Sequence, residues 1–299
     1  MIKIAVLEAS HSIEILSRTF ADISHLEFVG YHTSDLANVS FTDKKYQALF
    51  FQDFYQLLNV SDCVYINIPN YYDYAIAAIK NGKHLFLGQS IRYTIAELKI
   101  LIKLAIEAKV VVQSEHKIRF NPLFLSVDKD IQQTLFLELH HTLSSSTTDS
   151  DLFNTVVSDI DIVLSKIDNP VKKIVAQGFS VFDDSIDMLN ARIEFSNRSV
   201  AHIVFRKTKG DLYHHYHFFQ KDNDIFVDLG NKKSHINLYS ENKKEENKIS
   251  QNQSYTIKNE LILFLDSIQM QKLIPVPIEE MLHSLSITQE IFDLIKNKY

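Results

Sequence analysis

The chain begins with Ile2-Lys3-Ile4-Ala5-Val6-Leu7 and continues through Glu8-Ala9-Ser10-His11-Ser12-Ile13. The first run is almost entirely apolar, which is typical of a strand buried on both faces inside a parallel sheet. Apolar side chains then recur at helical spacing, at Ile13, Ile15, Leu16 and Phe20. We therefore expect a strand over residues 2–7 that runs into a helix over residues 12–22.

The same alternation of strand and helix continues over the first 120 residues. Further apolar runs of strand length lie at 26–32, 48–51, 63–68, 84–87 and 110–113, and helical spacing appears over 74–80 and 96–107. Asn81-Gly82 ends one helix with a residue that tolerates a left-handed backbone, and Thr94 with Glu97 forms a capping box at the start of the next. This order predicts an α/β domain over residues 1–120, a Rossmann-type doubly wound parallel sheet.

The pattern changes after Asn121-Pro122, where we expect a second domain over residues 121–299. A helix over 155–167 is followed by extended runs at 174–182, 189–196, 199–206, 212–220 and 225–229. Consecutive strands without helices between them predict an α+β domain with an open, mostly antiparallel sheet. The polar stretch 240–254 is expected to be a mobile loop. Two helices, 257–269 and 278–298, close the chain and could pack back on the first domain.

Composition excludes several classes of function. A net charge of −6 argues against a nucleic-acid or anionic-membrane surface, and no apolar stretch reaches the roughly 18 residues of a membrane helix. The chain begins with a strand and no secretory signal, so we expect it to be cytoplasmic. Cys63 is the single cysteine, it lies in an apolar run, and we expect it to be buried and inert.

Several motifs, taken in order, resemble one known family. They are Asn81-Gly82-Lys83-His84-Leu85, Arg119-Phe120-Asn121-Pro122, and Asp159-Ile160-Asp161 on the predicted helix of the second domain. Their order and spacing over nearly the whole chain resemble the glucose–fructose oxidoreductase, inositol dehydrogenase and MocA family (Gfo/Idh/MocA) of NAD(P)-dependent sugar oxidoreductases. The resemblance implies a Rossmann domain followed by an open sheet that commonly forms an oligomer interface.

The chain departs from this family where the cofactor would bind. Glu8, Ser10 and Ile13 stand at the positions of the family's three glycines, which let the backbone approach a pyrophosphate closely. Thr33 stands where an acidic residue would hold the ribose. The resemblance places a cofactor pocket at Ser10, His11, Ser12, Thr33, Pro69 and Gln89. NAD(P) is therefore the cofactor that the family implies, and the altered turn argues against its binding.

The acid–base groups of the family are also replaced. Its Glu-Lys-Pro motif, whose lysine assists proton transfer, corresponds to Gly88-Gln89-Ser90, and its histidine corresponds to Ser158. A glutamine cannot usefully exchange a proton near neutral pH. The remaining catalytic candidates are Gln89, His116 and Asp161. The substrate pocket that the resemblance implies contains Arg119, Asn121, Ser158 and Asp161.

These replacements favour a divergent family member that has lost ordinary NAD(P) hydride transfer. Such a protein would bind a sugar-like or nucleotide-like ligand between its domains, or a partner subunit. The alternative is an active NAD(P)-dependent oxidoreductase with a rebuilt site, in which serines 10 and 12 hold a phosphate and His116 or a tyrosine moves the proton. A homo-oligomer through the second-domain sheet is expected in either case.

Tyr213-His214-His215-Tyr216-His217 is the densest cluster of titratable aromatic residues. On a strand, His215 and His217 share one face with Tyr213, and His214 points the other way. Two histidines at this spacing are half of a zinc or copper site, which His202 or His235 would have to complete in space. We instead expect an aromatic sheet face and no metal. His140-His141 carries the same ambiguity more weakly.

Overall fold

The computed structural model describes residues 1–8, 13–33, 49–88, 91–181, 185–239, 243–248, 257–270 and 276–296, with backbone only for 243–248. The chain forms two compact units. The first comprises Met1–His116 and Thr256–Leu282, and the second comprises Lys117–Tyr255 and His283–Tyr299. Each unit has its own sheet and its own core, and each is described separately below.

A five-stranded sheet in the order β2-β1-β3-β4-β5 forms the centre of the first unit, and every strand pair in it is parallel. Its strands are β1 (Ile2–Glu8), β2 (Leu26–His32), β3 (Cys63–Asn67), β4 (His84–Leu87) and β5 (Val112–Ser114). Its helices are α1 (Ile13–Ala21), α3 (Phe54–Val60), α4 (Tyr72–Lys80), α5 (Ile95–Ala108) and α8 (Ile257–Met270). The Rossmann-type sheet predicted from the sequence is thus confirmed.

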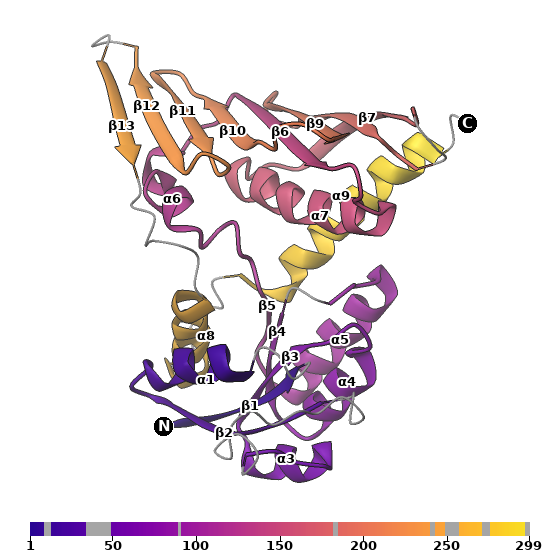
Figure 1. Cartoon of the computed structure of the whole chain (residues 1–299), viewed down its shortest axis with the longest axis vertical. Coiled ribbons are helices and arrows are strands. Elements are labelled where there is room, and N and C mark those ends of the chain that lie inside the picture. Colours follow the sequence, from indigo (N-terminus) through magenta and orange to yellow (C-terminus); the bar gives the residue numbers. More distant parts are fainter. Residues whose placement is uncertain are drawn as a thin grey trace. The chain divides into compact units, whose positions relative to one another are not determined.

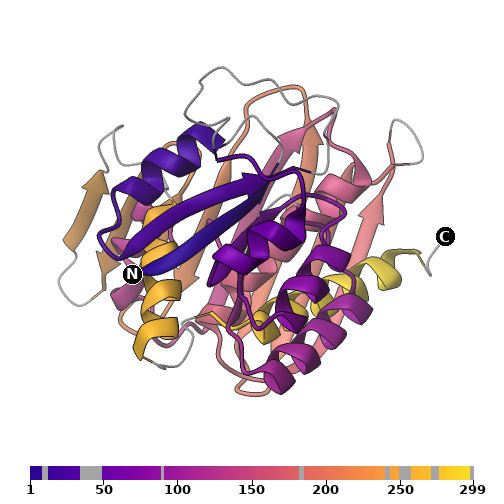
Figure 2. The same cartoon turned by 90° about the horizontal axis from the view of Figure 1, so that it is seen from below.

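Helices cover both faces of this sheet (Figures 1 and 2). On one face, α1 and α8 enclose a core that includes Phe20, Phe86 and Phe264. The rings of Phe86 and Phe264 meet edge to face with their centroids 5.3 Å apart. A helix from near the end of the chain therefore completes the core that the first residues begin.

The helix ends in this unit follow the local chemistry of the sequence. The side chain of Thr94 accepts a hydrogen bond from the Glu97 amide, and the Glu97 carboxylate accepts one from the Thr94 amide, so the predicted capping box is present. Gly82 follows α4 with a φ of +68°, in the left-handed region that a residue with a Cβ disfavours. Both predicted helix ends are therefore confirmed.

The expected strand over 48–51 is reduced to a single bridge between Tyr31 and Phe50. The Tyr31 amide donates to the Leu49 carbonyl, and the Phe51 amide donates to the Tyr31 carbonyl. A Cβ on Gly30 would lie 2.6 Å from the Leu49 oxygen, so glycine is what lets this segment approach β2. The short helix α3 follows and was not predicted, because seven residues are too few to establish a helical period.

The second unit is built on an eight-stranded sheet in the order β13-β12-β11-β10-β6-β9-β8-β7. The strands are β6 (Phe136–Ser144), β7 (Val171–Phe179), β8 (Met188–Phe195), β9 (Val200–Thr208), β10 (His214–Phe219), β11 (Asn223–Asp228), β12 (Lys233–Leu238) and β13 (Lys243–Lys248). Only the β6–β9 pair is parallel. The predicted open, mostly antiparallel sheet is confirmed.

Helices α7 (Asp149–Lys166) and α9 (Ile278–Lys296) pack on one face of this sheet (Figure 1). Two shorter pieces, α6 (Pro122–Leu125) and the 3-10 turn Asp128–Asp130, precede β6. Among the described residues, no helix covers the opposite face. Nor is any helix in the described ranges long and apolar enough to cross a lipid bilayer.

Three predictions for this unit are wrong in detail. Helix α7 begins six residues before the expected start, because Thr148 caps it by accepting a hydrogen bond from the Asp151 amide and its first turn is polar. Strands β6 and β12 were not predicted. The segment 240–254, expected to be a mobile loop, contains β13, which pairs with β12. An edge strand carries charged residues that prevent it from pairing with another molecule. The composition of β13 is therefore like that of a loop.

Candidate functional site

Ligands of open α/β sheets bind outside the carboxyl ends of the strands. In the first unit, β1 ends at Glu8 and β3 ends at Asn67, and these two residues are partners in the strand register. The Asn67 amide Nδ2 donates to Glu8 Oε2 over 2.6 Å, and Glu8 is only 4% exposed. A buried carboxylate therefore occupies the strand end at which the family has its first glycine.

Gly88 follows β4 and makes room for this arrangement. A Cβ at Gly88 would lie 2.5 Å from Asn67 Oδ1 and 2.6 Å from the Tyr65 hydroxyl. Any side chain at Gly88 would therefore displace the amide that holds Glu8. The family has a glutamate here, in its Glu-Lys-Pro motif. The chain thus lacks a carboxylate at the end of β4 and carries one at the end of β1.

A second polar contact joins Tyr65 within β3 to Glu115, the residue that follows β5. The Tyr65 hydroxyl donates to Glu115 Oε2 over 3.5 Å. Burial, and then the nearby carboxylates of Glu115 and Glu8, raise the pKa of Tyr65 far above its ordinary value. Tyr65 is therefore a neutral hydrogen-bond donor throughout the physiological range and cannot serve as a base there.

His116, a catalytic candidate, is 4% exposed. Its Nε2 lies 2.8 Å from the Ser114 hydroxyl, and its backbone amide donates to Glu260 Oε1 over 2.8 Å. Glu260 belongs to α8 and is fully buried. Helix α8 thus fixes the backbone of His116, and Ser114 fixes its ring. A catalytic imidazole and a purely structural one would both be held by such contacts.

The other predicted cofactor residues are only partly placed. Ser10, His11, Ser12 and Gln89 lie outside the described residues. Thr33 follows the end of β2 and is buried, whereas Pro69 lies in the exposed turn after β3.

In the second unit, two of the predicted substrate residues bind each other. Arg119 donates from Nε to Asp161 Oδ2 and from Nη2 to Asp161 Oδ1, both over 2.6 Å. Their side chains are 15% and 3% exposed. Two parallel charge-assisted bonds between buried groups make a strong pair. The Asp161 carboxylate is therefore committed to Arg119, with Ser284 donating to it at 3.4 Å.

The remaining two substrate candidates have local roles. The side chain of Asn121 accepts a hydrogen bond from the Leu123 amide over 2.9 Å and so caps α6. Ser158 is exposed on α7, and its hydroxyl donates to the Asn154 carbonyl. Of the four predicted substrate residues, the structure brings Arg119 and Asp161 together, and it gives Asn121 and Ser158 separate helix contacts.

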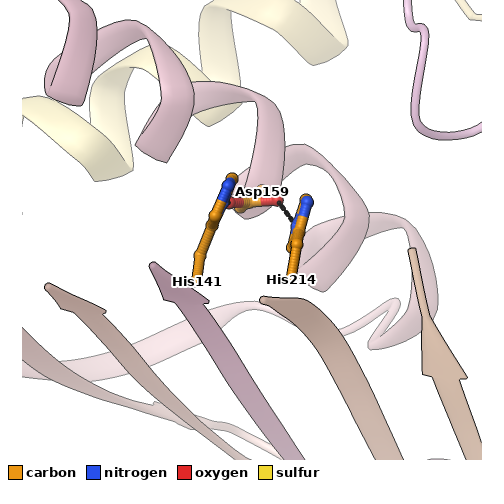
Figure 3. Close-up of side chains that lie close together, drawn as sticks. All are labelled: His141, Asp159 and His214. Carbon is orange, nitrogen blue, oxygen red and sulfur yellow. Dashed lines mark hydrogen bonds and ion pairs between the residues drawn. The ribbon is translucent and has the colours of Figure 1, made fainter. Parts of the chain in front are cut away.

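Asp159 is not among the functional candidates that the sequence suggests. Its carboxylate is fully buried between two histidines of the sheet (Figure 3). His141 Nδ1 lies 2.7 Å from Oδ2, His214 Nε2 lies 2.8 Å from Oδ1, and the Tyr216 hydroxyl also donates to Oδ1. Burial opposes ionisation of Asp159, but the two imidazoles outweigh it and lower its pKa well below the ordinary value.

A signal for this cluster was present in the sequence. His214 and Tyr216 alternate with His215 and His217 along one strand, so they must face the helix side of the sheet. The pairing of β6 with β10 could not be predicted, because β6 itself was not predicted from the sequence. That pairing places His141 directly opposite His214.

The other face of the same strands carries the expected aromatic surface. His140 and His215 stack with their ring centroids 5.1 Å apart, and burial lowers the pKa of both imidazoles. His217 hydrogen-bonds Asp224 at 2.8 Å. His202 lies beside Asn190 and His235 stacks on Phe226, and within the described part of the chain neither forms a close group of three ligands with His215 and His217.

A doubly wound parallel sheet followed by an open sheet with helices on one face defines a class of two-domain proteins built on a nucleotide-binding fold. The model of the GFO_IDH_MocA family, described as an oxidoreductase family with an NAD-binding Rossmann fold, matches residues 9–116. Over these residues the chain is similar to the family that the resemblance named. No curated protein matches its sequence.

Solved structures share the whole architecture. The UDP-N-acetylglucosamine 3-dehydrogenase GnnA from Acidithiobacillus ferrooxidans superposes with a TM-score of 0.86 at 18% identity, covering 99% of this chain and 98% of that one. A dehydrogenase from Clostridium difficile gives 0.85 at 14% identity, covering 98% and 99%. Biliverdin reductase from Synechocystis sp. PCC 6803, in complex with biliverdin and NADP+, gives 0.77 at 14% identity, covering 99% of each chain. At identities this low, the structural similarity establishes the fold alone.

Proposed function

We propose that this chain is a member of its oxidoreductase family that no longer performs ordinary NAD(P) hydride transfer and instead binds a sugar-like or nucleotide-like small molecule. The observation that carries the proposal is the buried carboxylate of Glu8, held by Asn67 at the end of β1. A glycine at this position leaves space and neutral backbone for a pyrophosphate. Glu8 instead places a charged side chain at this position.

Electrostatics adds to the steric argument. A carboxylate about 4 Å from one phosphate charge costs roughly 1–4 kcal/mol, depending on how well water screens the pair. That cost corresponds to a weakening of binding by about five-fold to several hundred-fold. The adjacent replacements Ser10 and Ile13 remove the two other glycines, so the three changes act on the same contact.

The loss of acid–base groups supports the same conclusion. Gln89 and Ser158 replace the lysine and histidine of the family, and Asp161 is bound to Arg119. A ligand that combines a sugar and a nucleotide would suit the architecture, because one neighbour with this fold is a UDP-N-acetylglucosamine 3-dehydrogenase. Retention of the second domain in full is consistent with continued binding of such a ligand.

Thermal unfolding tests the proposal directly. A ligand at 100 times its dissociation constant adds about 2.7 kcal/mol to the free energy of unfolding, which raises the Tm by a few degrees. We expect no rise for the natural protein in millimolar NADH or NADPH, and a rise for Glu8→Gly combined with Ser10→Gly. Glu14→Gln is the matched control, because Glu14 is half-exposed on α1 and pairs with Arg18 of the same helix. A rise for the natural protein equal to that of the double variant would overturn the proposal.

An active oxidoreductase with a rebuilt site is the second candidate, and the Ser114–His116 pair favours it. The 2.8 Å contact orients an imidazole just beyond a strand terminus, where a proton-transfer group would act. This candidate predicts a change at the nicotinamide absorbance band with some member of a sugar panel. The change should disappear in His116→Ala and persist in Glu14→Gln.

We further propose a homo-oligomer that forms through the uncovered face of the eight-stranded sheet. Val175 and Phe179 are 41% and 49% exposed on β7, and the half-buried rings of Tyr213, His215 and Phe226 lie on β10 and its neighbours. Light scattering after size exclusion should give a mass above 34.6 kDa. Phe226→Lys should then shift the mass to that of one chain, and a monomeric natural protein would refute the proposal.

A further inference from the structure

Two imidazoles and one carboxylate from three different elements meet beneath the eight-stranded sheet (Figure 3). We propose that His141, Asp159 and His214 bind a divalent transition ion such as Zn²⁺. The inference concerns the second unit alone and does not depend on whether the first unit binds a nicotinamide cofactor.

The donor set suits such an ion. Two neutral imidazoles and a carboxylate are ligands that Zn²⁺ takes in sites that keep a fourth position for water. One potential ligand atom from each residue lies within 4.8 Å of the others, so all three side chains lie within reach of a single ion. Bonds of about 2.0–2.2 Å place ligand atoms roughly 3–4 Å apart around a metal. The cluster is already near that size.

The surroundings of the carboxylate also suit a metal ligand. Asp159 is fully buried, and its two oxygens face the two imidazoles. The Tyr216 hydroxyl donates to Asp159 and lies 3.0 Å from His214 Nε2. Tyr216 would hold the carboxylate in place from behind, as the hydrogen-bonded partners of metal ligands do.

Entry of the ion requires one movement. The rings of His141 and His214 stack nearly parallel, with 3.6 Å between centroids and 9° between planes. An imidazole binds a metal in its own plane, so one ring must turn about its Cβ–Cγ bond. The side chains are 14% and 16% exposed, which gives them an edge at the surface and gives the ion a route.

The same two strands provide a matched control. His140 and His215 are the adjacent residues, point to the opposite face and also stack, at 5.1 Å. Among the described residues, they do not form a group of three close ligands with a carboxylate. Removing this pair deletes two histidines of the same strands and leaves the proposed site complete.

Isothermal titration of the tag-free full chain with Zn²⁺ at pH 7.5, and absorption spectra with Co²⁺, test the inference. We expect one ion per chain, with visible Co²⁺ bands of a site with nitrogen ligands. His141→Ala/His214→Ala should weaken binding by more than the roughly 10–100-fold that loss of a second-shell partner costs. His140→Ala/His215→Ala should bind as the natural protein does.

Several results would overturn the inference. They are no binding to the natural protein, equal binding by His141→Ala/His214→Ala, or loss of binding in the control pair. The first would leave the cluster as a hydrogen-bonded group only. Because the double variant could fail to fold, the Co²⁺ spectrum and the rise in Tm with Zn²⁺ are measured on the natural protein as well. His141→Ala alone provides a milder variant with the same expected direction.

Discussion

The side chains of Arg119 and Asp161 bind each other through two parallel hydrogen bonds of 2.6 Å in the second unit. Both residues match positions that the family resemblance assigns to a substrate pocket. Their geometry gives each a partner within the protein, so neither charge needs a ligand to be satisfied. The pair therefore contributes first to the stability of the fold, whatever else it contacts.

Replacing Asp161 with Asn should lower the free energy of unfolding by about 3–5 kcal/mol, because it leaves the Arg119 guanidinium buried without its counter-charge. Urea unfolding followed by circular dichroism measures the change. Ser158→Ala, three residues earlier on the exposed face of α7, should change stability by less than about 0.5 kcal/mol. Arg119→Met/Asp161→Leu should recover much of the loss, and a double variant no more stable than Asp161→Asn would contradict the prediction.

Gly88→Ala should destabilise the first unit through Asn67. The new methyl would lie 2.5 Å from Asn67 Oδ1, so the amide must move and release its hydrogen bond to Glu8. Loss of one donor to a buried carboxylate lowers the free energy of unfolding by about 1–3 kcal/mol. Asn67→Ala costs the same bond and removes the clash with the amide, although the Tyr65 hydroxyl remains 2.6 Å from the new methyl, so adding Gly88→Ala to it should cost less than Gly88→Ala costs alone. Fully additive losses in this double-mutant cycle would show that the two sites are independent.

Cys63 should resist thiol reagents until the first unit opens. The side chain is fully buried, and burial, with a smaller contribution from Asp62, raises the pKa of the thiol far above its ordinary value. Little thiolate is available at pH 8, and none of it is accessible. Reaction with a chromogenic disulfide should be slow in buffer and reach one thiol per chain in guanidinium. Fast stoichiometric labelling of the folded protein would contradict the burial of β3.

Asp224 should give the second unit an acid-dependent component of stability. Burial alone would raise the pKa of its carboxyl, but hydrogen bonds from His217 and Asn237 outweigh burial and lower the pKa. The carboxyl therefore stabilises the fold fully above its unfolded pKa near 3.9, and this contribution is lost as the pH falls through the lower folded value. Asp224→Asn should be less stable than the natural protein by about 1 kcal/mol at pH 7.

The stability difference between Asp224→Asn and the natural protein should shrink below about pH 4. Tm values measured from pH 7 to pH 3 follow this convergence, and Glu14→Gln serves as the exposed control. A constant difference across the range would mean that the carboxyl does not titrate differently in the folded and unfolded states.

Most of the first unit could be predicted from the sequence because its signals are local. Continuous apolar runs mark the buried parallel strands, and Thr94 and Gly82 mark helix ends through their own backbone chemistry. The exception is the segment around Phe50, where pairing depends on the space beside Gly30. That space is a tertiary property and leaves no periodic signal in the chain.

The clusters of polar side chains were harder to predict, because they join residues that are distant in sequence. Asp159 meets His141 and His214 only when α7 lies across β6 and β10. Strand β6 mixes polar and apolar residues and was missed, so its contacts were missed with it. Glu8 was recognised as a departure from the glycine turn, but its bond to Asn67 required the register between β1 and β3.

Helix α8 has a consequence for how the protein is made. Its Phe264 closes the core that β1, α1 and β4 begin, and its Glu260 binds the backbone of His116. A ribosome must therefore synthesise the chain through Phe264 before the first unit can reach its final packing. Until then, a nascent chain exposes the unfinished side of that sheet, and the first unit completes its folding after most of the second has already emerged.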